Sequence, residues 1–182
     1  KANAELIVVD GKSQDNTIDL VKYFLNQNDI VNFKIIPQSK PGLYEAFNFA
    51  IENATRKKLF FLHSDDILKC CDTFIKDINH CNADVIFYGI EIKGKFFKRK
   101  WHIKSLSGIN ISSMTIPPHV GILINKNVYN KIGVFRTDYK IAADFDWMLR
   151  LLTFSNISFS FSSEIIYMMN SGGVSNTGFF SE

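Results

Sequence analysis

The sequence has little net charge and no long apolar run, and each absence excludes a class of protein. Its 21 Lys and Arg residues are nearly balanced by 18 Asp and Glu residues, and the net charge of +3 is too small to indicate a nucleic-acid-binding protein. No run of about 18 apolar residues occurs, so we expect no membrane-spanning helix. The apolar segment near the N-terminus is too short for a signal peptide.

The sequence also lacks metal-ligand spacing of its cysteines and histidines, and it lacks the common glycine-rich loop motifs. The three cysteines (Cys70, Cys71 and Cys81) are odd in number and lack the spacing of metal ligands, so we expect buried or free thiols in a reducing cytosol. The four histidines lack that spacing as well. There is no Gly-x-Gly-x-x-Gly loop, no Walker lysine loop and no Gly-x-Ser-x-Gly elbow, which argues against the common dinucleotide-binding, ATP-binding and α/β-hydrolase folds.

The sequence does contain a regular alternation of strand-like and helix-like segments. In the N-terminal half, apolar runs at 5–9, 33–36, 58–62 and 84–92 are separated by segments of helical spacing at 16–25, 43–54 and 73–79. This order is typical of an α/β domain with a mostly parallel sheet and helices on its faces. With 182 residues and no linker or repeat, we expect one domain over residues 1–182.

The second half is expected to begin with a hairpin between Gly89 and Ile103. Further strands are expected at 122–124, 157–161 and 165–169, and helices at 127–132 and 144–153.

Acidic residues directly follow two of the expected strands. Asp10 ends the first strand, and Asp65 and Asp66 follow the strand at 58–62. Ligands of open α/β sheets bind beyond the carboxyl ends of the strands, and carboxylates there can hold a divalent cation together with phosphate oxygens. Asp residues also commonly end strands and cap helices, so a structural role stays open for each.

Two more groups of polar residues precede expected helices. Lys40-Pro41-Gly42 could direct a cation and backbone N–H groups at a phosphate, although most Pro-Gly pairs are only turns. Asp146 and Arg150 are four residues apart and can pair on a helix, which leaves Asp144 on the entry turn. A capped helix with a surface salt bridge is the alternative interpretation.

Four segments carry a combination of motifs that occurs in one enzyme family. They are ELIVVDGKSQDNT, PGLYEAFNFAIENA, FFLHSDD and the block from PHVGIL to DFDWMLRL, and together they span about residues 5–152. The first is similar to a strand with an acidic, Gly- and Ser-containing turn, and the second to a Gly–small–Asn segment before a helix. The third is similar to an Asp-x-Asp signature, and the fourth to an acceptor-side block that ends in Glu-Asp-x-Asp and Arg. In this order they resemble the family 2 glycosyltransferases.

The resemblance implies a GT-A fold, an α/β sandwich that binds a nucleotide sugar, and the transfer of a sugar with inversion. Residues 1–92 would form the nucleotide-binding half and residues 93–182 the acceptor-side half. The resemblance implies nucleotide binding by Asp10, Lys12, Gly42, Asn48 and Asp65, metal binding by Asp65 and Asp66, base catalysis by Asp144, and supporting roles on the acceptor side for His119 and Arg150.

Cofactor and partners follow from the same resemblance. It implies a divalent cation (Mn²⁺ or Mg²⁺), a nucleotide-sugar donor and a glycan or polyprenol-linked acceptor. The setting would be cell-surface polysaccharide or lipopolysaccharide assembly in a bacterial cytoplasm.

The chain departs from the family pattern at several positions. His63 replaces the first Asp of Asp-x-Asp, and Ala143 replaces the Glu before the base. Gly11-Lys12 stands where the family usually has Asp-Gly or Gly-Gly, and the lysine could instead meet a phosphate. The family's first strand and helix, which include a central strand of the sheet, have no counterpart ahead of Glu5. We therefore expect either that the chain is a fragment of a longer protein or that another segment supplies this strand.

Two other functions therefore stay open. A non-catalytic nucleotide-sugar- or glycan-binding relative would be compatible with His63, Ala143 and the lacking strand. A nucleotidylyltransferase would share the sheet and an acidic metal site, but it would need a Gly-rich loop with Arg and Lys near the first strand, which is not seen.

One stretch of the chain is strongly basic. Between Lys93 and Lys104, six Lys or Arg residues surround Phe96, Phe97 and Trp101. This stretch is either an ordinary hairpin with solvated lysines or a patch that contacts an anionic membrane surface. The second interpretation predicts peripheral contact with the inner face of the cell membrane.

Overall fold

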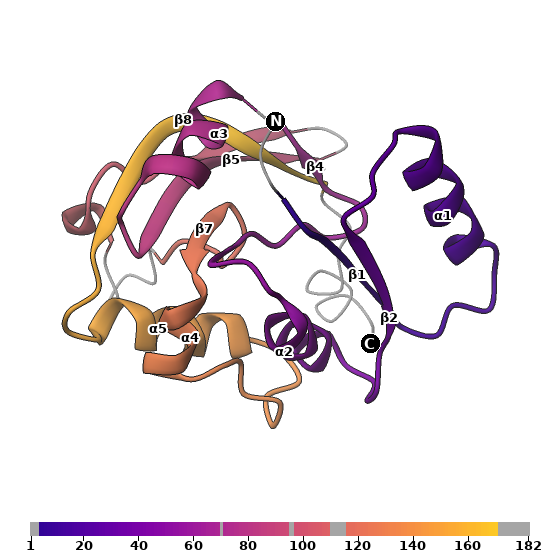
Figure 1. Ribbon diagram of the computed structural model, residues 1–182. Coiled ribbons are helices and arrows are strands. Elements are labelled where there is room, and N and C mark those ends of the chain that lie inside the picture. The colour runs from indigo at the N-terminus through magenta and orange to yellow at the C-terminus, as the bar shows by residue number, and fades with distance from the viewer. Residues whose placement is uncertain (1–3, 70, 95–96, 110–115, 171–182) are drawn as a thin grey trace.

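The computed structural model describes residues 4–69, 71–94, 97–109 and 116–170 (Figure 1). The helices are α1 (Thr17–Gln27), α2 (Leu43–Asn53), α3 (Asp72–His80), α4 (Lys126–Ile132), α5 (Ala143–Thr153) and a short 3-10 helix, η1 (Leu106–Gly108). The strands are β1 (Leu6–Asp10), β2 (Phe33–Pro37), β3 (Lys58–Leu59), β4 (Ile67–Leu68), β5 (Val85–Lys93), β6 (Lys98–Trp101), β7 (Ile122–Asn125) and β8 (Phe159–Asn170). They form a two-stranded and a six-stranded sheet.

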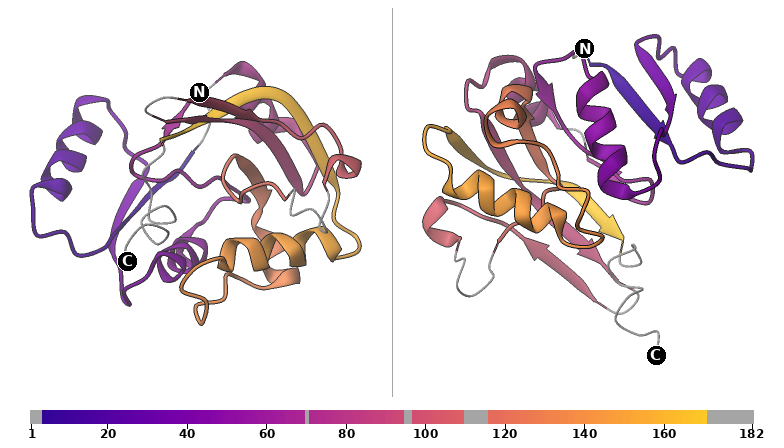
Figure 2. Two further views of the ribbon diagram at one scale, coloured as in Figure 1. Left: turned by 180° about the vertical axis from the view of Figure 1, so that it is seen from behind. Right: turned by 90° about the horizontal axis from the view of Figure 1, so that it is seen from below.

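The two-stranded sheet is a parallel pair, β1 and β2, joined by α1, as the alternation in the sequence predicts. Figure 2 shows that this unit projects to one side of the larger sheet. Glu5 ties it to the end of α2. Its carboxylate accepts hydrogen bonds from the backbone N–H and the hydroxyl of Thr55 at 2.8 and 2.9 Å, and it lies 3.0 Å from the Lys34 ammonium. The bond from the Thr55 backbone and the Lys34 contact lower the pKa of Glu5 to about 2.

The larger sheet has the strand order β3-β7-β5-β8-β4, with β6 also paired to β5. The prediction of a mostly parallel sheet is wrong here, because only β5 and β8 pair in parallel and the other pairs are antiparallel. The physical reason is that β7, from the second half of the chain, lies between β3 and β5 and runs antiparallel to both. The two strands that the alternation makes parallel to each other are therefore not direct neighbours. The hairpin of β5 and β6 is formed as predicted.

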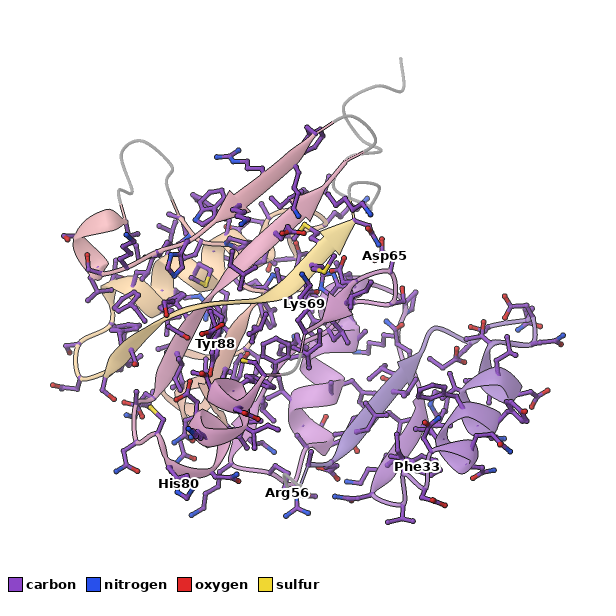
Figure 3. All side chains as sticks on the ribbon, turned by 90° about the horizontal axis from the view of Figure 1, so that it is seen from above. Phe33, Arg56, Asp65, Lys69, His80 and Tyr88 are labelled. Atoms are coloured by element: carbon purple, nitrogen blue, oxygen red, sulfur yellow. The ribbon has the colours of Figure 1, made fainter. Side chains whose placement is uncertain are left out.

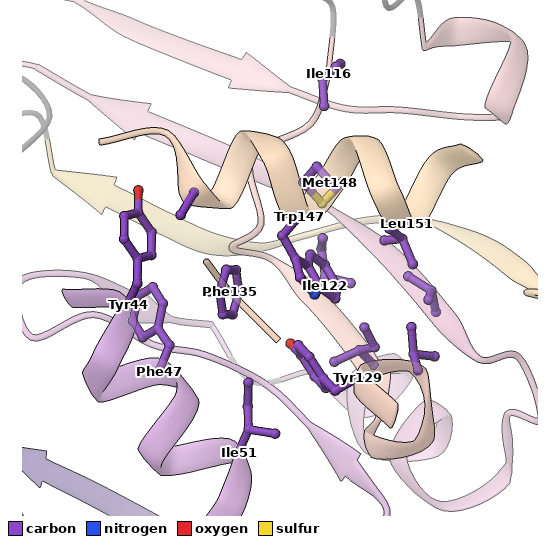
Figure 4. Close-up of a cluster of buried hydrophobic side chains, with 14 of the residues drawn as sticks. Tyr44, Phe47, Ile51, Ile116, Ile122, Tyr129, Phe135, Trp147, Met148 and Leu151 are labelled. Carbon is purple, nitrogen blue, oxygen red and sulfur yellow. The ribbon is translucent and has the colours of Figure 1, made fainter. Parts of the chain in front are cut away.

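Alternating side chains of β5 divide the core into two clusters. Val85 and Phe87 contribute to a cluster with α2, α4 and α5, whereas Ile86 and Tyr88 contribute to one with α3. Figure 4 shows the first cluster, in which aromatic side chains from α2, α4 and α5 surround Phe135. These three helices thus pack on one face of the sheet and α3 on the other.

Cys71 and Cys81 are free, as predicted, and Cys70 lies outside the described residues. No helix in the described parts of the chain is long and apolar enough to cross a membrane.

Candidate active site

The carboxylate of Asp144 lies in the first turn of α5, where the helix N-terminus favours a negative charge. The Tyr44 hydroxyl, from α2, donates a hydrogen bond to Asp144 Oδ1 at 3.1 Å. His119 Nδ1 lies 3.4 Å from Asp144 Oδ2, an ion-pair distance without the alignment of a hydrogen bond. The Asp144 side chain is 35% exposed, so a substrate can still reach it.

The same contacts determine the charge of Asp144. Partial burial alone would raise the pKa of this carboxyl group, but the contacts with His119 and Tyr44 outweigh it and hold the pKa below its usual range. Asp144 is therefore ionised at neutral pH, the state that a general base requires.

Two histidines from distant parts of the sequence meet beside this carboxylate. The rings of His63 and His119 have centroids 5.5 Å apart, and both pack on Phe47 of α2, at 5.4 and 5.1 Å. Burial, followed by the proximity of His119, lowers the pKa of His63. Both ring nitrogens of His119 and Nε2 of His63 are buried and lack a hydrogen-bond partner among the described residues. The sequence motifs single out His63 only as a departure from the family pattern and give no sign that it lies beside His119, which contacts Asp144.

Asp65 and Asp66 are adjacent in the chain but have different surroundings. The Asp66 carboxylate is 2% exposed and accepts hydrogen bonds from the Tyr167 hydroxyl at 2.5 Å and from the Asn170 N–H at 3.1 Å. Asp65 is exposed beside the end of β8 (Figure 3), and its carboxylate accepts no hydrogen bond from a described residue. Asp66 is thus held by the protein, and Asp65 is available to a ligand.

This arrangement is suited to a cation that is shared with a substrate. No group of three or more His, Cys, Asp or Glu side chains with metal-binding geometry occurs among the described residues. Magnesium-type sites commonly use one or two carboxylates and take their other ligands from substrate phosphates and water. Asp65 fits that requirement as a single carboxylate ligand.

Asp10 and Lys12 lie on the turn that follows β1. The Asp10 carboxylate accepts hydrogen bonds from the backbone N–H groups of Lys12 and Ser13, both at 3.1 Å, and from the Ser13 hydroxyl at 2.6 Å. Lys12 has a positive φ of 67° and an exposed side chain. Asp10 therefore closes the turn, and nucleotide binding by these two residues stays a prediction.

Asn48 and Arg150 both hold the segment around Phe135. The Asn48 amide donates to the Phe135 carbonyl at 2.8 Å and accepts from its N–H at 3.0 Å. Arg150 pairs with Asp146 at 2.9 Å and donates to the carbonyls of residues 132 and 134. Since Phe135 packs against Tyr44 and His119, these bonds support the floor of the site. The supporting role of Arg150 on the acceptor side and nucleotide binding by Asn48 both stay predictions.

Gly42 precedes α2 with a φ of 130°, a conformation that L side chains rarely adopt. A side chain at Gly42 would also meet the Glu45 carboxylate. Nucleotide binding at Gly42 stays a prediction.

The basic hairpin is exposed along β6. Lys98 pairs with Glu91 at 3.0 Å, and the Arg99 guanidinium lies over the Trp101 ring, 5.1 Å from its centroid. Lys95 and Phe96 lie outside the described residues. Membrane contact through this hairpin stays a prediction.

The family of the chain is decided by its match to a known family model. The model described as glycosyl transferase family 2 matches residues 1–148, well over half of the sequence. The chain belongs to glycosyl transferase family 2.

Relatives and solved structures agree with this family. A PGL/p-HBAD biosynthesis glycosyltransferase of Mycobacterium tuberculosis is 24% identical over 184 residues, which cover 95% of this chain and 68% of the relative. TarS of S. aureus, solved in complex with UDP, superimposes with a TM-score of 0.70 at 20% identity over 92% of this chain and 51% of TarS. A mannosyltransferase, PcManGT from Pyrobaculum calidifontis, in complex with GDP-Man and Mn²⁺, gives a TM-score of 0.61 at 15% identity over 90% of this chain and 47% of its own.

These likenesses confirm the GT-A-type fold expected from the sequence motifs. The chain spans about half the length of the solved structures that it matches. Its site combines residues of both expected halves, since Tyr44 and His63 come from the first and His119 and Asp144 from the second.

Proposed function

We propose that this family 2 domain transfers a sugar, with inversion, from a nucleoside diphosphate donor to an acceptor hydroxyl, and that Asp144 is the general base. The observation that carries the proposal is the partly exposed carboxylate of Asp144 in the first turn of α5, which accepts a hydrogen bond from Tyr44 and contacts His119. The family membership and the relatives named glycosyltransferases support sugar transfer as the reaction class.

A single displacement needs only one carboxylate. The acceptor hydroxyl oxygen forms a bond to the anomeric carbon, and the bond from that carbon to the diphosphate oxygen breaks. The nucleoside diphosphate leaves with the bonding electron pair, and the hydroxyl proton passes to the Asp144 carboxylate. Because the pKa of an alcohol lies far above 7, the base must take this proton as the hydroxyl attacks. Attack on the face opposite the leaving group inverts the anomeric centre.

Donor binding is assigned to the carboxyl ends of the strands. Asp65 would hold a divalent cation, which would offset the charge that develops on the leaving diphosphate. Asp10 and Lys12, on the turn after β1, are the candidates for contact with the nucleotide. Among the structurally similar proteins, TarS was solved with UDP and with UDP-GlcNAc, and PcManGT was solved with GDP-Man and Mn²⁺. These complexes support a nucleotide-sugar donor.

We expect a glycan or lipid-linked acceptor in cell-surface polysaccharide assembly at the cytoplasmic side of a membrane. The exposed lysines and arginine of β6 are the candidate contact with the lipid surface.

The function is tested by incubating the full-length protein with a panel of UDP- and GDP-sugars, Mn²⁺ and hydroxyl-bearing acceptors. We expect release of the nucleoside diphosphate from one donor, dependent on both acceptor and cation. Donor binding without any release would instead support the non-catalytic relative. No binding of any nucleotide sugar would overturn the proposal.

Replacement of His119 by Gln should change the pH dependence of the reaction. His119 helps to hold the pKa of Asp144 below its usual value, so its removal should raise that pKa. A general base is active only when it is deprotonated, so the acid limb of the pH–rate profile should move to higher pH. The loss of kcat/KM should therefore be larger at pH 5 than at pH 7. The measurement is kcat/KM against pH. His80→Gln, an exposed histidine at the end of α3, is the matched control. An unchanged acid limb would contradict the assignment.

A further inference from the structure

An apolar pocket adjoins the candidate base. It has a volume of about 230 Å³ and lies between the β5–β6–β8 part of the sheet and the start of α5. Its apolar lining includes Ile92, Trp101, Pro118, Phe145, Met148 and Met169. His119 and Asp144 supply its polar groups. The pocket is thus apolar on most sides and polar at the place where the reaction is proposed.

Irregular pairing in the sheet helps to form this pocket. The register between β5 and β8 shifts on both sides of Gly89. Regular alternation would place Ile92 on the face of Ile86 and Tyr88, which contact α3. Beyond the shift, Ile92 and Met169, which pair across β5 and β8, instead line the pocket together with Phe145 and Met148 of α5.

The polar end of the pocket has unused hydrogen-bonding groups. His119 is 8% exposed, and both of its ring nitrogens lack a hydrogen-bond partner among the described residues. Buried polar atoms normally have partners, so a hydroxyl at this end would satisfy a group that the described fold leaves unpaired. Asp144 Oδ2 lies 3.4 Å from His119 Nδ1, so one hydroxyl could reach both residues.

The walls select against a fully polar ligand. A free sugar has hydroxyl groups on nearly every side, and placing them against methionine, proline and isoleucine would remove hydrogen bonds to water without replacing them. A hydroxyl attached to a hydrocarbon or aromatic group matches both the walls and the polar end. A cavity of about 150 Å³ can take up benzene, so this pocket has room for a substituted ring or a short alkyl segment.

We propose that the pocket binds the apolar group beside the acceptor's reactive hydroxyl, so that the acceptor is an amphiphilic glycoside, alcohol or phenol rather than a free polar saccharide. This inference rests on the proposed function for the role of Asp144. Two kinds of acceptor have the required apolar aglycone: one in which it is an aromatic ring, and one in which it is a lipid chain.

Tryptophan fluorescence tests the pocket without requiring catalysis. Trp101 lines the pocket, whereas the other tryptophan, Trp147, is 1% exposed inside the core. The full-length protein is titrated with phenyl β-glucoside, with octyl β-glucoside below its micelle concentration, and with glucose. We expect a saturable change in emission with one or both glucosides and none with glucose. Trp101→Phe should abolish the change while calorimetry still detects binding. Equal responses to all three ligands, or none to either glucoside, would overturn the proposal.

A lysine in the wall provides the second test. Met169→Lys places a charge in the pocket and should weaken glucoside binding by about tenfold or more. Leu20→Lys makes the same kind of change on the exposed face of α1, where Leu20 is 65% exposed, and should leave binding unchanged. Equal losses in both variants would contradict the pocket assignment. If Met169→Lys does not fold, the conservative Met169→Gln is used in its place.

Transfer assays separate this inference from the proposed function. Glucoside binding without any sugar transfer would leave the pocket's ligand class standing and overturn the function. Transfer to free saccharides, with no preference for the phenyl or octyl glucosides, would support the function and overturn this inference. A preference for the phenyl or for the octyl glucoside identifies the aromatic or the lipid source.

Discussion

Replacement of Asp144 by Asn should lower kcat by about 10²–10⁴-fold, the usual contribution of a general base, while leaving donor affinity nearly unchanged. Asparagine has almost the same size and can still accept the hydrogen bond from Tyr44, but it cannot accept the acceptor's proton. The variant therefore tests the chemistry of the carboxylate rather than its packing. The measurements are steady-state turnover, donor affinity by calorimetry, and melting temperature.

Asp138→Asn is the matched control for this variant. Asp138 is exposed and pairs with Arg136, so its replacement removes the same charge from the surface with little effect on stability. We expect turnover close to that of the unmodified protein. An Asp144→Asn variant that keeps its turnover and loses only stability would show that Asp144 stabilises the start of α5 and does not act as the base.

The second large effect is expected at the acidic pair after β3. Asp65→Asn should weaken Mn²⁺-dependent binding of UDP or GDP by about tenfold or more, because it removes the one free carboxylate from the proposed cation site. It should hardly change stability, since Asp65 is exposed and its side chain has no partner among the described residues.

Asp66→Asn should have the opposite profile. Its carboxylate is buried and accepts hydrogen bonds from Tyr167 and Asn170, so replacement should lower the free energy of unfolding by about 1–3 kcal/mol. Calorimetry with and without Mn²⁺, together with chemical denaturation, separates the two effects. Loss of cation-dependent binding in Asp66→Asn alone would reverse the assignment of the two residues.

Local patterns in the sequence predicted most helices and strands because those patterns depend on near neighbours. Helical spacing located α2 and α5, and the apolar run at 84–92 located β5. The strand expected at 58–62 is only Lys58–Leu59, because the chain then leaves the sheet. Phe60 and Phe61 pack into different clusters, and an apolar run cannot by itself distinguish such a segment from a strand.

The order of the strands in the sheet could not be predicted in the same way. Which strands become neighbours depends on contacts between distant parts of the chain, such as those that place β7 between β3 and β5. The strands expected at 157–161 and 165–169 likewise form one continuous strand, β8, whose irregular register with β5 has no local signal in the sequence.

For the candidate site, the sequence by itself determined which residues are able to carry chemistry, and only the tertiary structure decided which of them lie together. The motifs identified Asp144 and the Asp65-Asp66 pair, because acidic residues at strand ends and helix starts can be recognised from neighbouring positions. They could not show that Tyr44, His63 and His119 gather around Asp144, or that Asp66 is used internally while Asp65 is exposed. Those differences arise from packing between α2, α5 and the ends of β7 and β8, where residues up to about a hundred positions apart come into contact. Burial and hydrogen bonding then give chemically identical side chains different roles.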